Sequence, residues 1–330
     1  MRSSGAMGLT SVTGVFSRYF VVGFFLPAYI ALVSLWFAAT SAFVPNELER
    51  YKPATQLLIL GGLALVAGLA LSGVSYYLTR LLEGYPLERT RTWRFLNVGY
   101  RAALGLQRRS FDRLRTIRDD ESQADNERAR AARLLDRSFP HAREALLPTR
   151  LGNALRAFER HSNTRWGLDG VTVWPRIEAL LGADERELHV DAKINFYVFM
   201  NGAVSAVAAG VCLVVDEAVH TPETRWGCLL YVLPFLVGYV LYRAALGPAS
   251  DWGDCVRSSI DLHRLELYEK LGVRTPTSFS DERGLAERVN QTLLFGEPFY
   301  LPDDLWHAEA GDQAPESTLF ALLKRIEIGG

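Results

Sequence analysis

The residue types that usually carry out catalysis are scattered along this chain and do not form a motif. The six histidines and three cysteines have no metal-ligand spacing, because no two of them form a His-x-x-x-His or Cys-x-x-Cys pair. The sequence also lacks a phosphate-binding glycine loop with a lysine, a dinucleotide-binding fingerprint and a nucleophile elbow. We therefore expect no enzyme activity, no metal site and no cofactor.

The hydrophobic residues are distributed unevenly, although the 330 residues together are 49% hydrophobic and 22% charged. Four long stretches contain no charged residue. A bilayer core is about 30 Å thick and needs about 20 apolar helical residues to cross it. This pattern excludes a soluble globule, a disordered chain and a disulfide-stabilised secreted domain. A net charge of −1 gives no support for nucleic-acid binding. We predict four transmembrane helices, at about 19–43, 56–79, 194–216 and 226–246.

The basic residues predict the orientation of the chain, since loops on the cytoplasmic side of a membrane are enriched in arginine and lysine. The segment 80–193 holds 21 arginines and one lysine, whereas the loop between the third and fourth spans holds only Arg225. We expect both termini and the long middle segment to be cytoplasmic, with two short loops outside. Cys212 and Cys228 would then lie toward the outer side, and the sequence leaves open whether they pair or are buried separately.

These features predict an all-α, polytopic membrane protein with four transmembrane helices and a cytoplasmic helical domain. We expect a cytoplasmic tail over 1–18, a first transmembrane hairpin over 19–83 and a cytoplasmic helical domain over 84–190. A second transmembrane hairpin over 191–247 would follow. The remaining segment, 248–330, is expected to be cytoplasmic and helical and to pack on the 84–190 domain.

Apolar residues at helical spacing predict the helices of the cytoplasmic parts. The first two, around 100–117 and 129–139, are joined by a polar turn over 119–126. Thr149 is the expected N-cap of a third helix. The segment 167–174 has the pattern of a loop or a short extended piece, and Pro175 fits the first turn of a short helix after it.

Two longer helices are expected to join the membrane to the cytoplasmic parts. An uninterrupted helical pattern from Asp184 predicts one rod of about 30 residues that includes the third span. After the fourth span Gly247 and Pro248 permit a kink, with a second helix over 249–271. Another helix is expected near 281–294, and a short terminal helix carries Leu319, Leu322, Leu323 and Ile326.

Small and polar residues in the spans indicate where helices meet. Small residues that recur every four positions let helix backbones approach closely, either within one bundle or between the subunits of a homo-oligomer. Asn201 is polar at membrane depth, where it either bonds a neighbouring helix or, together with Ser205, lines a water-filled path. The small residues are Ala64, Gly68, Ser72, Gly202, Ala206 and Gly210.

Arginine dominates the basic residues, since only four of the 36 are lysines. Genome composition accounts for such a bias. In addition, arginines that lie beside the second span can bind anionic lipid headgroups. The residues in that position are Arg80, Arg89, Arg91 and Arg94.

Two segments combine tryptophan, glycine and charged residues in a recognisable order. The first reads LPTRLGNALR over 147–156, followed by WGLD at 166–169 and VWPR at 173–176, and the second begins at Trp252 and contains DLHR at 261–264. Together they resemble segments of a group of bacterial four-span membrane proteins, and the resemblance implies a bacterial inner-membrane location and a shared cytoplasmic module without a known activity. Their polar residues either form a cluster near the membrane surface or only cap and brace helices: Asn153, Arg156, Asp169, Arg176, Asp261 and Arg264.

The function that these features favour is a non-enzymatic, oligomeric scaffold or effector that is anchored in the lipid bilayer. Its cytoplasmic domain would bind a protein partner. The alternative is a channel or pore, with Asn201 and Ser205 facing the path. An enzyme that acts on lipids through the region of Asn153, Arg156 and Asp169 is less favoured, because no nucleophile or metal-binding set is visible.

Overall fold

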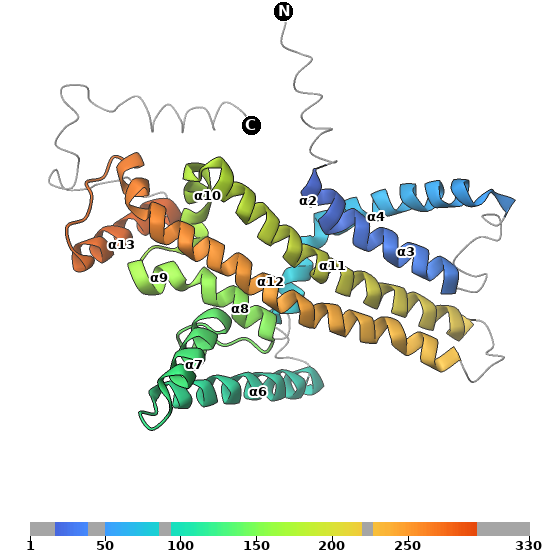
Figure 1. Cartoon of the computed structure of the whole chain (residues 1–330), viewed down its shortest axis with the longest axis horizontal. Helices are drawn as coiled ribbons and strands as arrows, with labels where there is room; N and C mark the ends of the chain where they lie inside the picture. The colour runs from blue at the N-terminus through green and yellow to red at the C-terminus, as the bar shows by residue number, and fades with distance from the viewer. Residues whose placement is uncertain (1–16, 39–49, 86–93, 220–226, 296–330) are drawn as a thin grey trace, which may run out of the picture. The chain divides into compact units, whose positions relative to one another are not determined.

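The computed structural model describes residues 17–38, 50–85, 94–219 and 227–295, and the elements in these ranges are all helical (Figure 1). The all-α prediction is therefore confirmed for this part of the chain. The terminal helix expected around 319–326 lies outside the described residues.

The chain divides into two compact units, which are described separately. The first comprises Met1–His161 and Gly182–Ser258, and the second comprises Ser162–Leu181 and Ser259–Gly330. All four apolar helices begin in the first unit. The packing of 248–330 on 84–190 stays a prediction.

Four helices are long and apolar enough to cross a membrane, as the four uncharged stretches predicted. The first is continuous but contains a π-helical turn, η1, between its two α-helical parts. Its N-terminus is capped by Ser17, whose hydroxyl accepts a hydrogen bond from the Phe20 N–H. The elements of this helix are α2 (Arg18–Phe20), η1 (Val21–Phe25) and α3 (Leu26–Ala38).

The second apolar helix, α4 (Pro53–Glu83), has the start and stop signals that the sequence contains. A proline occupies its first turn, where a backbone N–H would have no helical partner. Gly84 ends the helix in the left-handed conformation, with a φ of 92°.

The other two apolar helices extend well beyond the length that a membrane requires. The rod expected from Asp184 is present as α11 (Ala183–Val219), a helix of 37 residues. The fourth span and the helix expected after it form one element, α12 (Gly227–Lys270), of 44 residues. The division at Gly247 and Pro248 was therefore wrong: Pro248 lies inside the helix, where it removes one hydrogen bond without ending the element.

The helices α6 (Arg94–Asp119) and α7 (Asp125–Ser138) lie side by side as a hairpin (Figure 1). The turn between them falls within the polar segment 119–126, as predicted. Leu104 and Phe111 of α6 and Leu135 of α7 form a core together with Phe139 and Leu146, which follow α7. A short 3-10 turn, η3 (Arg143–Ala145), leads from this hairpin to α8 (Arg150–Glu159), and Thr149 caps α8 as expected.

The second unit is built around α10 (Gly170–Leu180) and α13 (Phe279–Phe295), which contact each other. The helix expected near 281–294 is confirmed. The loop expected over 167–174 was wrong in its second half, because Asp169 caps α10 by accepting a bond from the Thr172 N–H. The helix therefore begins at Gly170, and Pro175 lies in its interior instead of its first turn. A short helix, α9 (His161–Trp166), precedes it.

Candidate functional site

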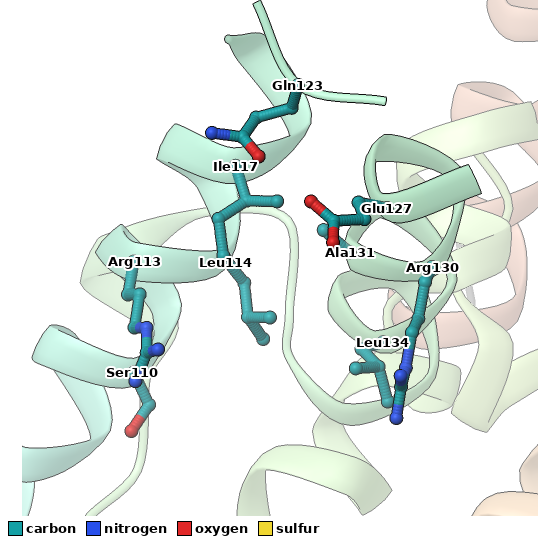
Figure 2. Close-up of a pocket in the computed structure, with 9 residues that line it drawn as sticks. All are labelled: Ser110, Arg113, Leu114, Ile117, Gln123, Glu127, Arg130, Ala131 and Leu134. Atoms are coloured by element: carbon teal, nitrogen blue, oxygen red, sulfur yellow. The ribbon is translucent and has the colours of Figure 1, made fainter. Parts of the chain in front are cut away.

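A groove lies between α6 and α7 in the first unit (Figure 2). Its volume is about 620 Å³. Figure 2 shows the side chains of Leu114, Ile117 and Leu134 pointing toward the space between the two helices. These apolar groups form the floor, and the groove lies near the α6–α7 turn. The complete lining is Ser110, Arg113, Leu114, Ile117, Gln123, Glu127, Arg130, Ala131 and Leu134.

Charged side chains form the rim of this groove. Neither Arg113 nor Arg130 makes an ion pair among the described residues. Neighbouring charges on the same hairpin are neutralised: the Arg143 guanidinium donates two hydrogen bonds of 2.9 Å to Asp112 and so holds the pKa of that carboxyl below its ordinary value. The groove thus combines an apolar floor with two arginines that have no carboxylate partner in the described chain.

The sequence indicated only part of this groove. Leu114 and Ile117 belong to the predicted stripe of α6, but Leu134 was missed. Leu134 directly precedes Leu135, which faces the core. Adjacent residues point to different sides of a helix, so the helical period assigns only one of these two leucines to the buried face. Two adjacent leucines on a short helix were the available signal that α7 has a second apolar surface.

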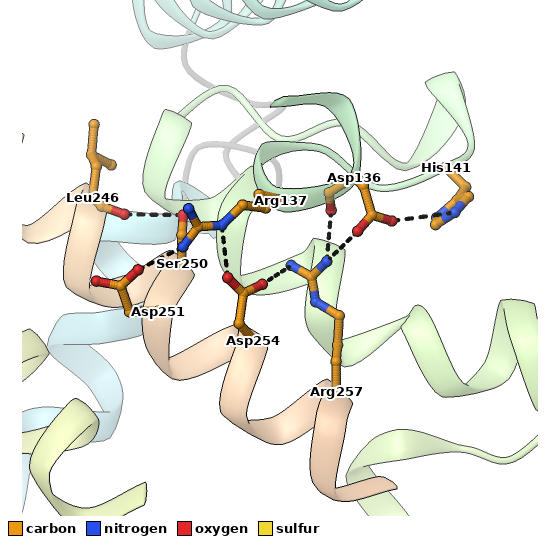
Figure 3. A network of polar contacts seen from close by, with 8 residues as sticks. All are labelled: Asp136, Arg137, His141, Leu246, Ser250, Asp251, Asp254 and Arg257. Atoms are coloured by element: carbon orange, nitrogen blue, oxygen red, sulfur yellow. Dashed lines mark hydrogen bonds and ion pairs between the residues drawn. The ribbon is translucent and has the colours of Figure 1, made fainter. Parts of the chain in front are cut away.

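A network of ion pairs fixes α7 against the part of α12 that lies beyond the fourth span (Figure 3). Arg257 Nη1 donates hydrogen bonds of 2.7 Å to a carboxylate oxygen and 3.1 Å to the main-chain carbonyl of Asp136. From α7, Arg137 pairs with Asp251 at 2.5 Å and with Asp254 at 2.8 Å. Each of the two helices supplies one arginine and at least one aspartate to this network. The ion pairs therefore favour one position of α7 along α12.

Replacing Arg257 by methionine should weaken this contact, lowering the free energy of unfolding by about 1.5 kcal/mol through the loss of charge-assisted bonds. The side chain of Arg257 is only 7% exposed, whereas Asp136 is half exposed and can return to water. Thermal unfolding of the full-length protein in detergent micelles measures the effect. Arg115→Met is the matched control, because Arg115 pairs at 3.7 Å with Asp119 and both side chains are more than half exposed, so its loss should change stability by less than about 0.5 kcal/mol. Equal effects of the two substitutions would show that the contacts of Arg257 do not stabilise the fold more than an exposed ion pair does.

The segment 147–156 docks the polar helices onto the last turn of α4. Thr149 Oγ1 donates a 2.8 Å hydrogen bond to the Glu83 carbonyl and accepts one of 3.0 Å from the Gly152 N–H. A Cβ atom on Gly152 would lie 2.4 Å from the Glu83 carbonyl oxygen, and one on Gly84 would lie 2.5 Å from Pro148. The Glu83 backbone therefore requires glycine at 152, while the Pro148 ring and a φ of 92° require it at 84.

Asn153 and Arg156 complete this junction. Asn153 is 0% exposed and holds the main chain of Leu147 from both sides, accepting from its N–H at 2.7 Å and donating to its carbonyl at 2.9 Å. Arg156 donates bonds of 2.8 Å to the Ala145 carbonyl and 2.7 Å to the Tyr85 hydroxyl. These two candidate residues are thus engaged in positioning the junction.

Two guanidinium groups lie over the ring of Tyr85 at this junction. Arg80 lies 4.7 Å and Arg156 5.0 Å from its ring centroid. Arg80 also pairs with the buried Glu83 at 3.1 Å, so this headgroup candidate already has a carboxylate partner. Of the other headgroup candidates, Arg94 is the first residue of α6, and Arg89 and Arg91 lie outside the described residues.

The remaining candidate residues of the polar cluster belong to the second unit. Trp166 Nε1 donates a 2.5 Å hydrogen bond to Asp261, and the Arg264 guanidinium lies 3.7 Å from the Trp166 ring centroid. Arg264 also donates to the Asp261 carbonyl and, at 2.9 Å, to Glu282. Asp261 and Arg264 therefore come together in one cluster around Trp166.

Asp169 and Arg176 serve local roles in the same unit. Asp169 caps α10 and donates its own N–H to Asn290 at 2.9 Å, and Arg176 is exposed and donates to the Thr172 carbonyl. The sequence missed Glu282, because a glutamate in the first turn of a helix is ordinarily exposed. Burial raises its pKa, although the Arg264 charge opposes the shift.

The small residues of the spans pack inside one chain. A Cβ atom on Gly68 would lie 3.1 Å from the Phe25 backbone, and one on Gly210 would lie 2.9 Å from the Phe235 ring. Gly202 likewise faces Leu241. Ala64 is buried, whereas Ser72 and Ala206 are partly buried. Subunit contact through these residues stays a prediction.

Asn201 is fully buried and donates a 2.7 Å hydrogen bond to the Gly23 carbonyl in the π-helical turn η1. Its Oδ1 atom has no hydrogen-bond partner among the residues that the structure describes. Ser205, one helical turn later, is partly buried. The side chain thus links α11 to the first apolar helix, while its role in lining a path stays untested.

Asn201→Leu should change the free energy of unfolding by less than about 1 kcal/mol. It removes one interhelical hydrogen bond, of the kind worth about 0.6 kcal/mol in membranes, but also a buried unsatisfied oxygen. Chemical unfolding in mixed micelles measures the difference. A loss above about 2 kcal/mol would mean that Oδ1 has a partner, such as a water molecule, which contributes to stability.

No group of three or more histidine, cysteine, aspartate or glutamate side chains within the described ranges could hold a metal ion. Cys212 and Cys255 are free thiols, and the side chain of Cys228 is outside the described part. The polar features described above are the groove between α6 and α7, the ion pairs between α7 and α12, and the contact of α8 with the end of α4. Comparison with protein-family models, with curated proteins and with solved structures gave no match for this chain.

Proposed function

We propose that this protein is a non-enzymatic scaffold or effector of a bacterial inner membrane, in which the groove between α6 and α7 binds a protein partner. The observation that carries the proposal is an apolar groove with two rim arginines that have no carboxylate partner in the described chain. We expect this groove and both termini to be cytoplasmic, because the segment 80–193 is rich in arginine and such segments favour the cytoplasmic side. The four helices that are long and apolar enough to cross a membrane would anchor the chain.

The chemistry of the groove favours an acidic amphipathic helix as the partner. Helices with one apolar face bind in hydrophobic grooves between other helices. The floor of Leu114, Ile117 and Leu134 would take the apolar face, while Arg113 and Arg130 would pair with carboxylates of the partner. Glu127, which lies on the same rim, would repel any carboxylate of the partner placed next to it. The partner's carboxylates would therefore have to lie beside the two arginines.

The ion pairs between α7 and α12 support the proposal that the protein is an effector. A partner in the groove contacts α7, and the Arg137 and Arg257 pairs join α7 to α12. α12 continues without interruption into the fourth apolar helix. Displacement of α7 would therefore be passed on to a membrane helix.

Binding of two designed peptides tests the proposal. The peptides are amphipathic helices with identical apolar faces, one with acidic and one with basic polar faces, and fluorescence anisotropy measures their binding to the full-length protein in micelles. We expect the acidic peptide to bind more tightly and R113E/R130E to reduce its affinity about tenfold, because each charge contact is worth up to about 1 kcal/mol.

Leu106→Glu is the matched control, because Leu106 is an exposed leucine of α6 that does not line the groove. It should leave peptide binding unchanged, whereas Leu134→Glu should abolish it. Equal affinity for the two peptides, or insensitivity to R113E/R130E, would refute the groove as a binding site. Ion flux through vesicles that contain the protein would instead favour a channel, and native mass spectrometry would give the subunit number of the expected homo-oligomer.

A further inference from the structure

A second hollow, of about 470 Å³, lies among the apolar helices α3, α11 and α12. Small side chains create it, because Ala31, Gly202, Ala206 and Ala209 leave space that larger residues would fill. The only polar side chains in its lining are the hydroxyls of Ser34 and Ser205, apart from which Leu, Ile, Val, Ala, Gly and Pro surround the space.

We propose that this hollow binds one acyl chain of a membrane lipid. Water does not suit it, because a buried water molecule needs two to four polar partners and the lining offers two hydroxyl groups at separate helices. An empty space would forfeit the van der Waals contacts of its walls. The occupant must therefore be apolar, and the medium around membrane-spanning helices consists of hydrocarbon chains.

The length of the hollow fits one acyl chain. Its lining runs from Leu26 to Leu35 on α3 and from Val198 to Leu213 on α11, which corresponds to about 14–22 Å along the helix axes. A hydrocarbon core is about 30 Å thick, so one lipid tail covers about 15 Å.

Two variants that differ by one position test this proposal. Ala209 lines the hollow, whereas the adjacent Ala208 is exposed and does not. Ala209→Phe fills the space with an aromatic ring, and Ala208→Phe places the same ring on the outer surface of the same helix. Native mass spectrometry of the full-length protein, purified in mild detergent, measures how much phospholipid stays bound.

We expect the wild type and A208F to retain a phospholipid, and A209F to retain at least about tenfold less, because overpacking a filled site costs enough to reduce occupancy by that factor. In vesicles that contain a phospholipid with a photoreactive acyl chain, the wild type should be labelled at the residues of α3 and α11 that line the hollow. This second measurement needs no substitution, so it stands even if A209F fails to fold.

Equal lipid retention by A208F and A209F would overturn the proposal, as would an absence of label from the lining residues of the wild type. Loss of a dimer in A209F, with no lipid bound to the wild type, would show that a second copy covers the hollow. The peptide experiment with the α6–α7 groove is independent of these outcomes, because none of its residues lines the hollow.

Discussion

Replacing Asn153 by alanine is expected to lower the free energy of unfolding by about 3–5 kcal/mol. The substitution removes both partners of the Leu147 main chain at once, since the Asn153 amide accepts from the N–H and donates to the carbonyl of that residue. Leu147 is 1% exposed, so water cannot replace either bond without opening the core. Each orphaned buried group costs about 1–3 kcal/mol, and the cavity left by the amide adds to the loss.

Thermal and chemical unfolding of the full-length protein in micelles measure this effect. Asn163→Ala is the control, because Asn163 is an exposed asparagine in a helix and its substitution should change stability by less than about 0.5 kcal/mol. Asn153→Asp keeps an acceptor for the Leu147 N–H but loses the donor to its carbonyl, so it should be destabilising as well. A loss below about 1 kcal/mol for Asn153→Ala would show that Leu147 finds other partners.

Gly152→Ala should be the second most damaging substitution, with a loss of about 3 kcal/mol. The added Cβ would lie 2.4 Å from the Glu83 carbonyl oxygen and 2.8 Å from Leu147 Cδ1. The carbonyl is part of the α4 backbone and cannot rotate aside, so α8 must move away from α4 and break the Thr149 bond to Glu83.

Gly105→Ala provides the control for this prediction. Gly105 lies inside α6, and a Cβ atom there would meet nothing within 4 Å. Because alanine has a higher helix propensity than glycine, this variant should gain up to about 1 kcal/mol. The same chemical change is thus expected to have opposite signs at two helical sites. Equal shifts in the unfolding midpoint would show that α8 does not dock closely on α4.

The membrane-crossing helices could be predicted from the sequence because lipid imposes a simple condition. A helix in hydrocarbon satisfies its own backbone and needs only apolar side chains, so an uncharged stretch is sufficient to reveal it. Thr149 was predicted as an N-cap for a similar reason, since the start of a helix depends on local chemistry. Pro248 illustrates the limit, because whether a proline ends a helix depends on the packing around it.

The candidate sites were harder to predict, because they depend on contacts between distant residues. Asn153 was singled out as polar, but its role follows from the position of Leu147, six residues earlier and on the far side of a turn. The groove depends on how α6 and α7 are rotated against each other, which decides that Leu135 faces the core and Leu134 the groove. Sequence periodicity identifies the face of a helix that carries most of its apolar residues, and one leucine outside that face does not show what it contacts.

The contact of α8 with the last turn of α4 also bears on the order of events during biosynthesis. Chains are made from the N-terminus, and early segments fold first. α4 and its Gly84 terminus are complete more than sixty residues before Thr149 leaves the ribosome. The surface of α4 on which α8 docks is therefore synthesised before α8. A truncated gene product that starts after α4 would lack the surface on which Gly152 and Thr149 rest, so its behaviour in water would not represent the same region of the intact chain.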